Sequence, residues 1–417
     1  MKAISINAER LLGRIRTLGG LGRDEAGRLT RLAATDADKL GRDAFADWSR
    51  EAGLDLRVDR IGNLFAIWRD ALDPAEAPLM IGSHIDTVID AGMLDGCYGV
   101  LAGLEVVQTL KESGTIPHRP VAVAAFTNEE GVRFAPDMMG SAVFAGSCPL
   151  EAALASQDTD GATLGSELRR IGYAGSEPPG FIKPCAYIEL HIEQGPVLER
   201  EGIQIGAVDS LQGISWHRIV IHGQANHAGT TPMTMRRDAG HAAARLIDFL
   251  NRMAMERAPH LVATVGSLEL SPNAINVVPG EAILTVDMRS PDDGILAEAE
   301  ERLAAFVQDM RDRDGFSIAQ TRLAQTPPVQ FDERMARLIE KVTRARGMSV
   351  RRMTSGAGHD AQMLAAICPT AMIFVPSAGG ISHNPREHTA DDQLISGADV
   401  LLDTVRELTS PTDGRSA

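Results

Sequence analysis

Histidine and acidic side chains follow short apolar runs at widely separated points of this 417-residue chain. The runs at residues 79–81 and 121–126 are typical of buried strands, because they are brief, apolar and bounded by polar residues. An open α/β sheet places its ligands outside the carboxyl ends of its strands. Six side chains stand just past such runs: His84, Asp86, Glu129, Glu130, His191 and His383. The fold must therefore bring segments from both ends of the chain to one edge of a sheet.

These residue types are the ones that hold divalent metal ions. His84 and Asp86 are two residues apart on an extended chain, so their side chains share a side. Asp86 is therefore expected to hold the second imidazole nitrogen of His84. Asp95 lies in a glycine-rich loop, where a lone carboxylate can bridge two cations. Glu129 and Glu130 point different ways, so one can bind a metal while the other serves as general base.

A structural role is the simpler explanation for any one of these residues. A single histidine beside an apolar run is more often hydrogen-bonded within a core, and an isolated Glu-Glu pair is usually solvated on a surface. The joint occurrence of His-x-Asp, Asp-Gly, Glu-Glu-Gly and two later histidines, all at strand ends, is hard to obtain by chance. We therefore interpret the set as a two-metal hydrolytic site.

Composition excludes several classes of partner. A hydrophobic content of 44% with 23% charged residues is typical of a globular enzyme. The formal charge of -15 argues against nucleic acid and against an anionic membrane surface, because phosphate contact needs a basic face. No apolar run is long enough to cross a bilayer, and residues 1–7 lack an apolar stretch of signal-peptide type. A cytoplasmic location is expected.

The cysteines predict no disulfide framework. Cys97, Cys148, Cys185 and Cys368 show no close CxxC spacing and are expected to be reduced thiols. Cys97 lies two residues past Asp95, where it could be sensitive to metal or oxidation. A small residue packed beneath the site is the interpretation we favour.

The pattern of apolar residues changes near residue 210. Before it, helix-like and strand-like segments alternate; after it, residues 215–223 alternate like a half-exposed strand. We expect a discontinuous catalytic domain, residues 1–211 and 330–417, interrupted by an insert at residues 212–329. Residues 410–417 are expected to form a loose tail. Within the insert, the pattern predicts helices at residues 238–253 and 295–312 and strands at residues 263–270 and 282–288.

In these motifs the chain resembles the M20 metallopeptidase-like amidohydrolases, and within them the hydantoinase/carbamoylase branch. That branch includes N-carbamoyl-L-amino acid hydrolases, bacterial β-ureidopropionases, allantoate amidohydrolases and ureidoglycolate amidohydrolases. A peptidase of the wider superfamily would be expected to have a carboxylate at the His191 position, so this histidine points to the amidase branch. The most specific stretches are residues 126–134, 189–196, 223–233, 276–280 and 355–361.

The resemblance implies an α/β fold of two domains. The metallopeptidase-like catalytic domain would be a mixed sheet flanked by helices, and the insert a smaller α+β lid and dimerisation domain. It also implies two divalent ions per subunit, with Asp95 as the bridging ligand and Glu129 as the general base. Two further pairs of ligands would complete the two sites: His84 with His191, and Glu130 with His383. Mixed nitrogen and oxygen ligation fits Zn²⁺, Mn²⁺, Co²⁺ or Ni²⁺ and does not decide among them.

Other residues are candidates for substrate contact. His227 lies in a turn-rich segment and can donate to an oxyanion, although a structural turn histidine is the simpler alternative. Arg289 ends a predicted strand, where a guanidinium can clamp a carboxylate. The resemblance implies that Gln194, Asn276 and Arg289 bind the carboxylate and ureido ends of a substrate. It also implies that His227 reaches the active site of a partner subunit, and hence a homodimer.

The segment at residues 355–361 supplies two further predictions. Gly358, in a loop with other glycines, allows a close approach of backbone to substrate. His359 and Asp360 could be read as part of a second metal site. We interpret them instead as residues that support the ligands or cap a helix.

Ser215-Trp216 bears on the choice of substrate. Allantoate amidohydrolases of this branch tend to carry an arginine pair where this chain has Ser215-Trp216. The prediction is therefore hydrolysis of an N-carbamoyl-L-α-amino acid, or of N-carbamoyl-β-alanine, to the amino acid, CO₂ and ammonia. Allantoate and ureidoglycolate remain alternatives, because the 355–360 motif occurs widely in the branch. A dipeptidase or N-acyl deacylase would use the same metals, whereas a non-catalytic binding protein would have lost Glu129 or a ligand.

Overall fold

The computed structural model describes residues 4–69 and 76–410. Contacts divide the chain into two compact units, one formed by Met1–Asp209 with Gln330–Ala417 and the other by Ser210–Val329. The expected tail lies outside the described residues, apart from Ser410. Within the described part of the chain, no helix is long and apolar enough to cross a membrane.

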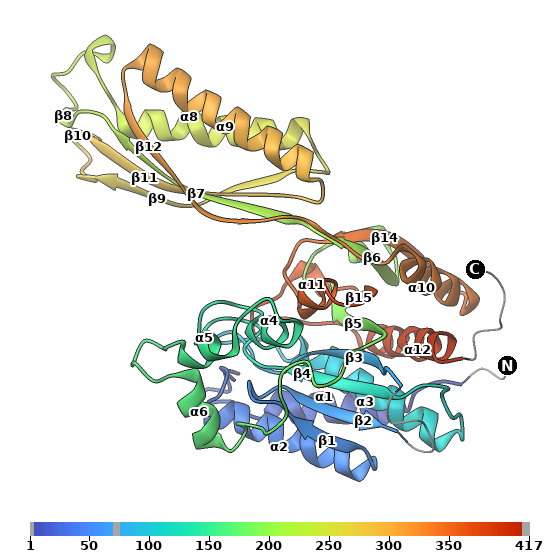
Figure 1. The fold of residues 1–417 in the computed structure, drawn as a ribbon. Helices are drawn as coiled ribbons and strands as arrows, with labels where there is room; N and C mark the ends of the chain where they lie inside the picture. The colour runs from blue at the N-terminus through green and yellow to red at the C-terminus, as the bar shows by residue number, and fades with distance from the viewer. Residues whose placement is uncertain (1–3, 70–75, 411–417) are drawn as a thin grey trace. The chain divides into compact units, whose positions relative to one another are not determined.

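The first unit is built around a mixed β-sheet (Figure 1). Four central strands run parallel: β3 (Leu79–His84), β4 (Val121–Phe126), β5 (Ala186–Ile192) and β15 (Thr370–Val375). The others are β1 (Asp55–Val58), β2 (Leu64–Trp68), β6 (Ile205–Leu211), β13 (Val329–Gln330) and β14 (Val350–Ser355). In the described residues the order is β1-β2-β4-β3-β5-β15-β6-β13, with β14 beside β6. The carboxyl ends of the four parallel strands therefore meet at one edge.

Burial explains why the central strands are continuous apolar runs in the sequence. Every residue of β3, β4, β5 and β15 is buried, as expected for parallel strands covered on both faces. Helix α3 (Cys97–Glu112) packs against β3 and β5, and α12 (Asp391–Leu408) packs against β15. Helix α11 (Asp360–Leu364) contacts β5 through the side chain of Glu189. Successive side chains of a strand point to opposite faces of the sheet, so Glu189 and Leu190 face different sides.

The remaining helices of this unit surround the sheet, as Figure 1 shows. Helix α3 is buried on nearly every side because it lies between the sheet and two other helices, α1 and α12. Helix α1 (Ala8–Gly20) begins after its N-cap Asn7. The others are α2 (Asp36–Glu51), α4 (Met139–Ala145), α5 (Leu150–Ala155), α6 (Leu164–Ile171), α7 (Val197–Glu201) and α10 (Glu333–Ala345), with a 3₁₀ turn, η2, at Ala378–Gly380.

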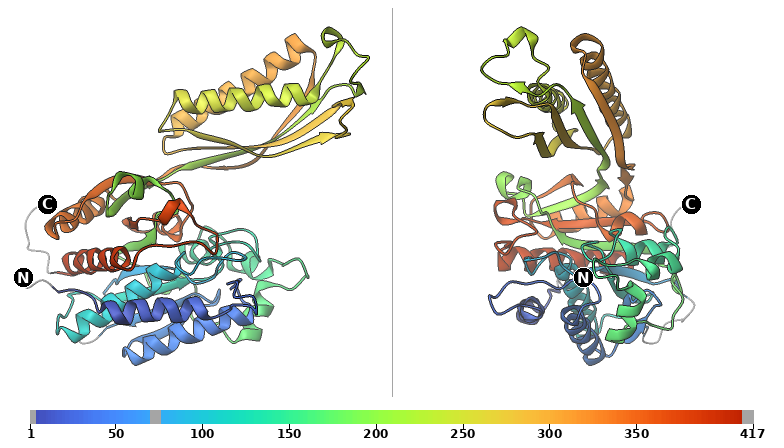
Figure 2. Two further views of the ribbon diagram at one scale, coloured as in Figure 1. Left: turned by 180° about the vertical axis from the view of Figure 1, so that it is seen from behind. Right: turned by 90° about the vertical axis from the view of Figure 1, so that its left-hand side faces the viewer.

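The second unit is a four-stranded antiparallel sheet with two helices on one face (Figure 2). Its strands, in spatial order, are β12 (Ser317–Thr326), β7 (Gly213–His222), β11 (Glu281–Ser290) and β9 (Val262–Ser271). The helices are α8 (Ala239–Glu256) and α9 (Asp293–Asp314). Buried and exposed residues alternate along β7, so one face packs on the helices and the other does not.

A short ladder in this unit organises the His227 segment. Strand β8 (Asn226–His227) pairs with β10 (Val277–Val278) in antiparallel register, with His227 opposite Val277. The 3₁₀ turn η1 (Met233–Met235) follows. The ladder is what brings residue 276 beside residue 227, although the two positions are 49 apart in the sequence.

Candidate active site

The carboxyl edge of the parallel strands gathers the predicted metal ligands. His84 is the last residue of β3, Glu129 and Glu130 follow β4, and His191 is near the end of β5. Asp95 lies between β3 and α3, and His383 lies in the loop that follows β15. The topology thus places all five predicted ligands, together with Glu129, in one cluster.

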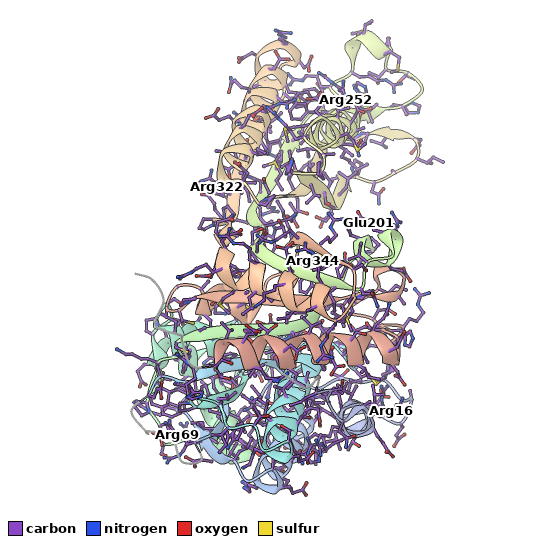
Figure 3. The ribbon with its side chains drawn as sticks, turned by 90° about the vertical axis from the view of Figure 1, so that its right-hand side faces the viewer. Arg16, Arg69, Glu201, Arg252, Arg322 and Arg344 are labelled. Atoms are coloured by element: carbon purple, nitrogen blue, oxygen red, sulfur yellow. The ribbon has the colours of Figure 1, made fainter. Side chains whose placement is uncertain are left out.

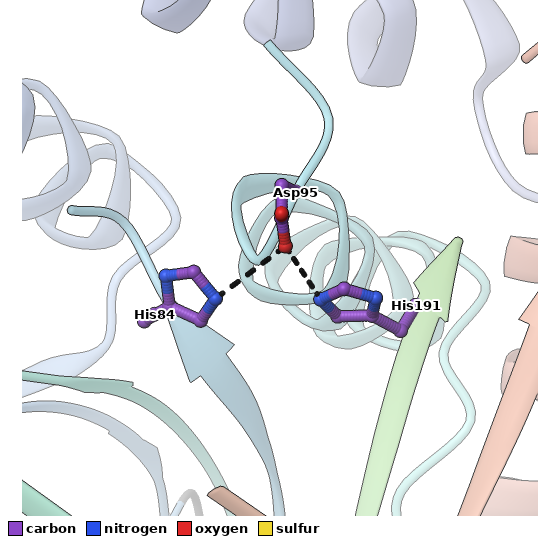
Figure 4. A group of neighbouring side chains, drawn as sticks. All are labelled: His84, Asp95 and His191. Carbon is purple, nitrogen blue, oxygen red and sulfur yellow. Dashed lines mark ion pairs between the residues drawn. The ribbon is translucent and has the colours of Figure 1, made fainter. Parts of the chain in front are cut away.

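One group of three ligands is fully buried (Figure 4). Oδ1 of Asp95 lies 3.1 Å from Nε2 of His191 and 3.7 Å from Nε2 of His84. The other ring nitrogen of each histidine faces a backbone carbonyl, at 3.0 Å for His84 and 2.9 Å for His191. Because a carbonyl only accepts, Nδ1 carries the proton and Nε2 has the lone pair that a metal requires. In His191 this lone pair accepts from the backbone N–H of Gly96 at 3.0 Å.

A second group uses the other oxygen of the same carboxylate. Nε2 of His383 lies 3.1 Å from Oδ2 of Asp95 and 3.6 Å from Oε2 of Glu130. The side chain of His383 is 53% exposed, whereas those of His84 and His191 are 1% exposed. Two triplets that share only Asp95, each through a different oxygen, form the arrangement a bridging carboxylate requires.

The donor set fits divalent cations. Imidazole nitrogen and carboxylate oxygen suit Zn²⁺ and its first-row neighbours, and the ligand atoms of each triplet lie within 4.8 Å of one another. Oε1 of Glu130 is buried without a hydrogen-bond partner, as is Oε1 of Gln194. Buried acceptors of this kind are costly unless a cation or donor meets them.

Glu129 is a second buried carboxylate beside His84. It is buried, and its Oε2 lies 3.4 Å from Nε2 of His84. Burial, followed by repulsion from the carboxylates of Asp360 and Glu130, raises the pKa of Glu129 well above its usual range. A carboxylate with a raised pKa takes a proton more readily, which suits a general base working near neutral pH.

Asp86 has a different contact from the one expected. Its carboxylate was predicted to hold Nδ1 of His84, yet its backbone carbonyl does so, and the carboxylate Oδ1 lies 3.9 Å away. The reason is that β3 ends at His84, so the alternation of an extended chain does not continue to residue 86. The carboxylate instead accepts from the N–H groups of Glu129 and Glu130, both at 3.3 Å. Asp86 therefore orients the loop that carries both glutamates.

The backbone around the site is conformationally restricted. Gly96 has φ of 64°, and a Cβ at this position would lie 2.5 Å from Cδ2 and Cε1 of the His84 ring. Only glycine fits there, because any side chain would displace a ligand. Three other residues of the site have positive φ: Asn128, Gln194 and His383. Such conformations gather at functional sites, where the surrounding structure holds them in place.

Gln194 lies inside the metal-ligand cluster. It was predicted to bind substrate, and its Nε2 donates to Oδ2 of Asp95 at 2.9 Å and lies 3.4 Å from Nε2 of His383. His359 supports the buried triplet, since its ring packs edge-on at 4.6 Å against His191 and its Nε2 contacts Ser355 at 3.0 Å. Gly358 is confined on one side by Met138, whose Cε would lie 2.8 Å from an added Cβ.

Three residues of the site had no role in the sequence analysis. Arg31 is completely buried and donates to the carbonyl of Ile85 and to the sulfur of Cys97. Burial raises the pKa of the Cys97 thiol to about 11, which fits a packed residue better than a reactive one. Glu189 accepts from the hydroxyl of Ser83 and from the backbone of α11. The third, Glu387, stands four positions after His383 in the same loop, a spacing that carries no distinctive signal.

In the second unit, His227 is arranged as a hydrogen-bond donor. Its Nδ1 accepts from the N–H groups of Gly229 at 3.0 Å and Thr230 at 3.2 Å. Both contacts require a lone pair on Nδ1, so the neutral ring carries its proton on the exposed Nε2. Asn276 lies beside it, with its carbonyl accepting from Ala228 at 2.9 Å. The structure thus groups two of the predicted substrate-binding positions in this unit.

Arg289, a predicted substrate contact, already pairs with a carboxylate of its own strand. Arg289 is the penultimate residue of β11, and its guanidinium is bidentate with Asp287, at 3.1 Å from Nε and 2.8 Å from Nη2. A substrate carboxylate would have to compete with Asp287 for it.

Ser215 is fully buried, so it cannot itself contact a ligand. Its hydroxyl donates to Glu300 and accepts from Nε2 of His217 at 2.9 Å, while Glu300 also pairs with Arg322 (labelled in Figure 3) at 2.6 Å. Trp216, 41% exposed, is the one member of the Ser-Trp pair with a free surface.

Comparison with known proteins identifies the family to which this chain belongs. The sequence matches peptidase family M20/M25/M40 over residues 80–407. An N-carbamoyl-L-amino-acid amidohydrolase of Rhizobium meliloti is 42% identical over 402 residues, which cover 96% of each protein. An allantoate amidohydrolase of Bacillus subtilis is 33% identical over 94% of this chain and 96% of its own. A solved amidase of the hydantoinase/carbamoylase family from Burkholderia multivorans aligns with a TM-score of 0.95 at 42% identity, over 97% of this chain and 98% of that chain.

Proposed function

Because this chain belongs to peptidase family M20/M25/M40, we propose that it is a metal-dependent amidohydrolase that cleaves the ureido C–N bond of N-carbamoyl-L-amino acids. The products are the amino acid, CO₂ and ammonia. The observation that carries the proposal is Asp95, whose two oxygens face two separate ligand groups. The similarity to N-carbamoyl-L-amino-acid amidohydrolases supports the choice of substrate class.

Two divalent ions held by His84, Asp95, His191, Glu130 and His383 would make water more acidic and polarise the ureido carbonyl. In our proposal Glu129 removes a proton from the attacking water and delivers it to the leaving nitrogen. The buried position of Glu129 beside His84 supports this role, since a base must lie within reach of the reacting water. Asp86 keeps Glu129 in place through the backbone of the 129–130 segment.

Substrate recognition is assigned to side chains of both units. Gln194 would meet the ureido group, and Arg289 would exchange Asp287 for the substrate carboxylate in the same bidentate geometry. Nε2–H of His227 would donate to the oxyanion that forms when water adds to the carbonyl, and the neighbouring Asn276 would add an amide contact. Gly358 would offer its backbone to the substrate.

We also propose that residues 212–329 form a lid and dimerisation domain of a cytoplasmic homodimer, in which His227 acts in the partner's active site. Mixing two inactive variants tests this directly. If His227 acts across subunits, Glu129→Gln and His227→Ala chains combined in equal amounts would form heterodimers with one intact site, restoring about a quarter of wild-type turnover. If it acts within its own subunit, mixing would restore nothing.

Allantoate is the second candidate substrate, because an allantoate amidohydrolase is 33% identical over most of both chains. The test is ammonia release by Mn²⁺-reconstituted protein from N-carbamoyl-L-methionine, N-carbamoyl-β-alanine, allantoate, ureidoglycolate and a dipeptide. Metal-loaded Glu129→Gln protein is the matched control for contaminating activity. Turnover of a carbamoyl amino acid well above that of allantoate supports the proposal, whereas preference for allantoate or for the dipeptide would replace it.

A further inference from the structure

Glu387 lies in the same loop as His383, between β15 and α12, and its carboxylate reaches the loop that carries Asp95. Its Oε1 accepts from the backbone N–H of Leu94 at 2.9 Å and of Asp95 at 3.2 Å. Its Oε2 accepts from the hydroxyl of Ser382 at 2.9 Å. Glu387 is only 6% exposed. One buried carboxylate therefore joins two segments that are nearly 300 residues apart in sequence.

Each contact of Glu387 is adjacent to a metal ligand. Ser382 precedes His383, and its hydroxyl also lies 3.4 Å from Oδ2 of Asp95. Gly92, at the start of the Asp95 loop, leaves no room for a side chain, because an added Cβ would overlap Glu387 itself. No room for a side chain therefore remains between Gly92 of the Asp95 loop and Glu387.

The two ligand groups differ in how firmly the fold holds them. His84 and His191 belong to buried strands, so the sheet sets their positions. His383 has a half-exposed side chain and a φ of 51°, and it lies in a loop. The distance between His383 and Asp95 therefore depends on the contacts that join the His383 loop to the Asp95 loop.

We propose that Glu387 is a positioning residue that sets the separation of His383 from Asp95 and thereby the affinity of the second metal position. The inference rests on the proposed two-metal function. Loss of an outer residue that orients a ligand typically lowers metal affinity about 10–100-fold. Here the loss falls mainly on the second position, because His84 and His191 of the buried triplet are held by strands, whereas His383 is held only by its loop.

The test is calorimetric titration of metal-free protein with Mn²⁺, compared between wild type and variants. Wild type should bind two equivalents; fewer than two would count against the proposed function rather than against Glu387. Glu387→Ala should weaken one binding event about 10–100-fold and leave the other within about 3-fold. Glu387→Gln, which keeps an acceptor for the two N–H groups and a polar contact for Ser382, should restore most of the lost affinity.

Two further variants keep the test decisive if Glu387→Ala does not fold. Ser382→Ala removes the hydroxyl that contacts Oε2 of Glu387 and Oδ2 of Asp95, leaves the two backbone contacts of Glu387 in place, and should weaken the same event. Gly92→Ala should do likewise by displacing Glu387. Glu105→Gln is the matched control, because Glu105 is a fully buried carboxylate that pairs with Arg10; it should lower thermal stability without changing either event.

Activity provides a second readout that a purely structural role would not produce. In Glu387→Ala, kcat should fall at limiting Mn²⁺ and recover in excess Mn²⁺, with KM unchanged. The proposal would be overturned if Glu387→Ala and Ser382→Ala both bound two equivalents of Mn²⁺ with the affinities of the wild type. An equal loss of both events that Glu387→Gln fails to restore would also overturn it.

Discussion

Replacing Gly96 with alanine is the sharpest single test of how this fold builds its metal site. Gly96 caps the start of α3 directly after Asp95, the proposed bridging ligand, with φ of 64° and ψ of -50°. A Cβ there would lie 2.5 Å from two carbons of the His84 ring, whereas ordinary contacts begin at 3.4 Å. The imidazole would have to retreat by about 0.9 Å, since the backbone behind Gly96 is fixed by the helix.

The size of the effect follows from these distances. Metal–ligand bonds tolerate deviations of only about 0.2 Å, so a shift near 0.9 Å removes His84 from coordination. We expect Mn²⁺ affinity at the buried position to fall by about 100-fold or more, at least the upper end of the effect of losing an orienting residue. Backbone strain and overpacking should also lower the free energy of unfolding of the metal-free protein by about 2–6 kcal/mol.

Gly114→Ala is the matched control. Gly114 lies just past the other end of α3 with φ of 70°, and an added Cβ there meets nothing within 4 Å. It should cost about 1–3 kcal/mol of strain and leave metal binding unchanged. Calorimetric Mn²⁺ titration and urea unfolding of both variants give the comparison. A Gly96→Ala protein that still binds two equivalents with wild-type affinity would refute the reasoning.

Three further predictions concern individual side chains. Metal-loaded Glu129→Gln should retain both ions but lose about 10²–10⁴-fold in kcat, and near wild-type ammonia release would assign the base elsewhere; Glu130→Gln should instead lose metal. His227→Ala should lower kcat about 10²–10³-fold with metal content intact, and an unchanged kcat would exclude it as the oxyanion donor. Burial lowers the pKa of His217 below its ordinary 6.5, so the unfolded chain gains a proton that the folded one does not. The free energy of unfolding should therefore fall as pH drops below 6.5, by up to about 1.4 kcal/mol per pH unit from this group. His217→Gln should remove that part of the slope in urea titrations at pH 5 to 7, and an identical slope would contradict the assignment.

Much of the fold was predictable because the central parallel strands of the first unit are buried on both faces. The apolar runs at residues 79–81 and 121–126 lie in β3 and β4, and the helix expected at residues 295–312 is α9, Asp293–Asp314. The resemblance to the M20 family is confirmed by the match over residues 80–407. Parallel strands then place their following residues together, which is why ligands far apart in sequence could be grouped.

Contacts between loops were not predictable by the same reasoning. Asp86 was assigned from the alternation of an extended chain, but β3 ends two residues earlier and its carboxylate turns to the 129–130 segment. Ser215 was treated as a marker of substrate preference, yet it is an inward-facing residue of β7 bonded to Glu300. Periodicity predicts which face a strand residue takes only when the partner sheet and its register are known.

Glu387 shows a different limit. A glutamate four residues after a histidine has no distinctive spacing, and its partners are backbone N–H groups that any sequence possesses. Glu387 can hold both segments only because the loop after β15 packs against the loop before α3. The pairing of Arg289 with Asp287 is local, two residues apart on one strand face, and could have been predicted from the alternation of β11.

In the proposed site two cations share Asp95, one through each oxygen. Anomalous diffraction from crystals of Mn²⁺-loaded protein tests this sharing most directly, because it locates each ion independently of activity. We expect two peaks about 3.5–4 Å apart, one beside His84 and His191 and one beside Glu130 and His383. A single peak, or a second peak away from Asp95, would show that the two cations do not share this carboxylate.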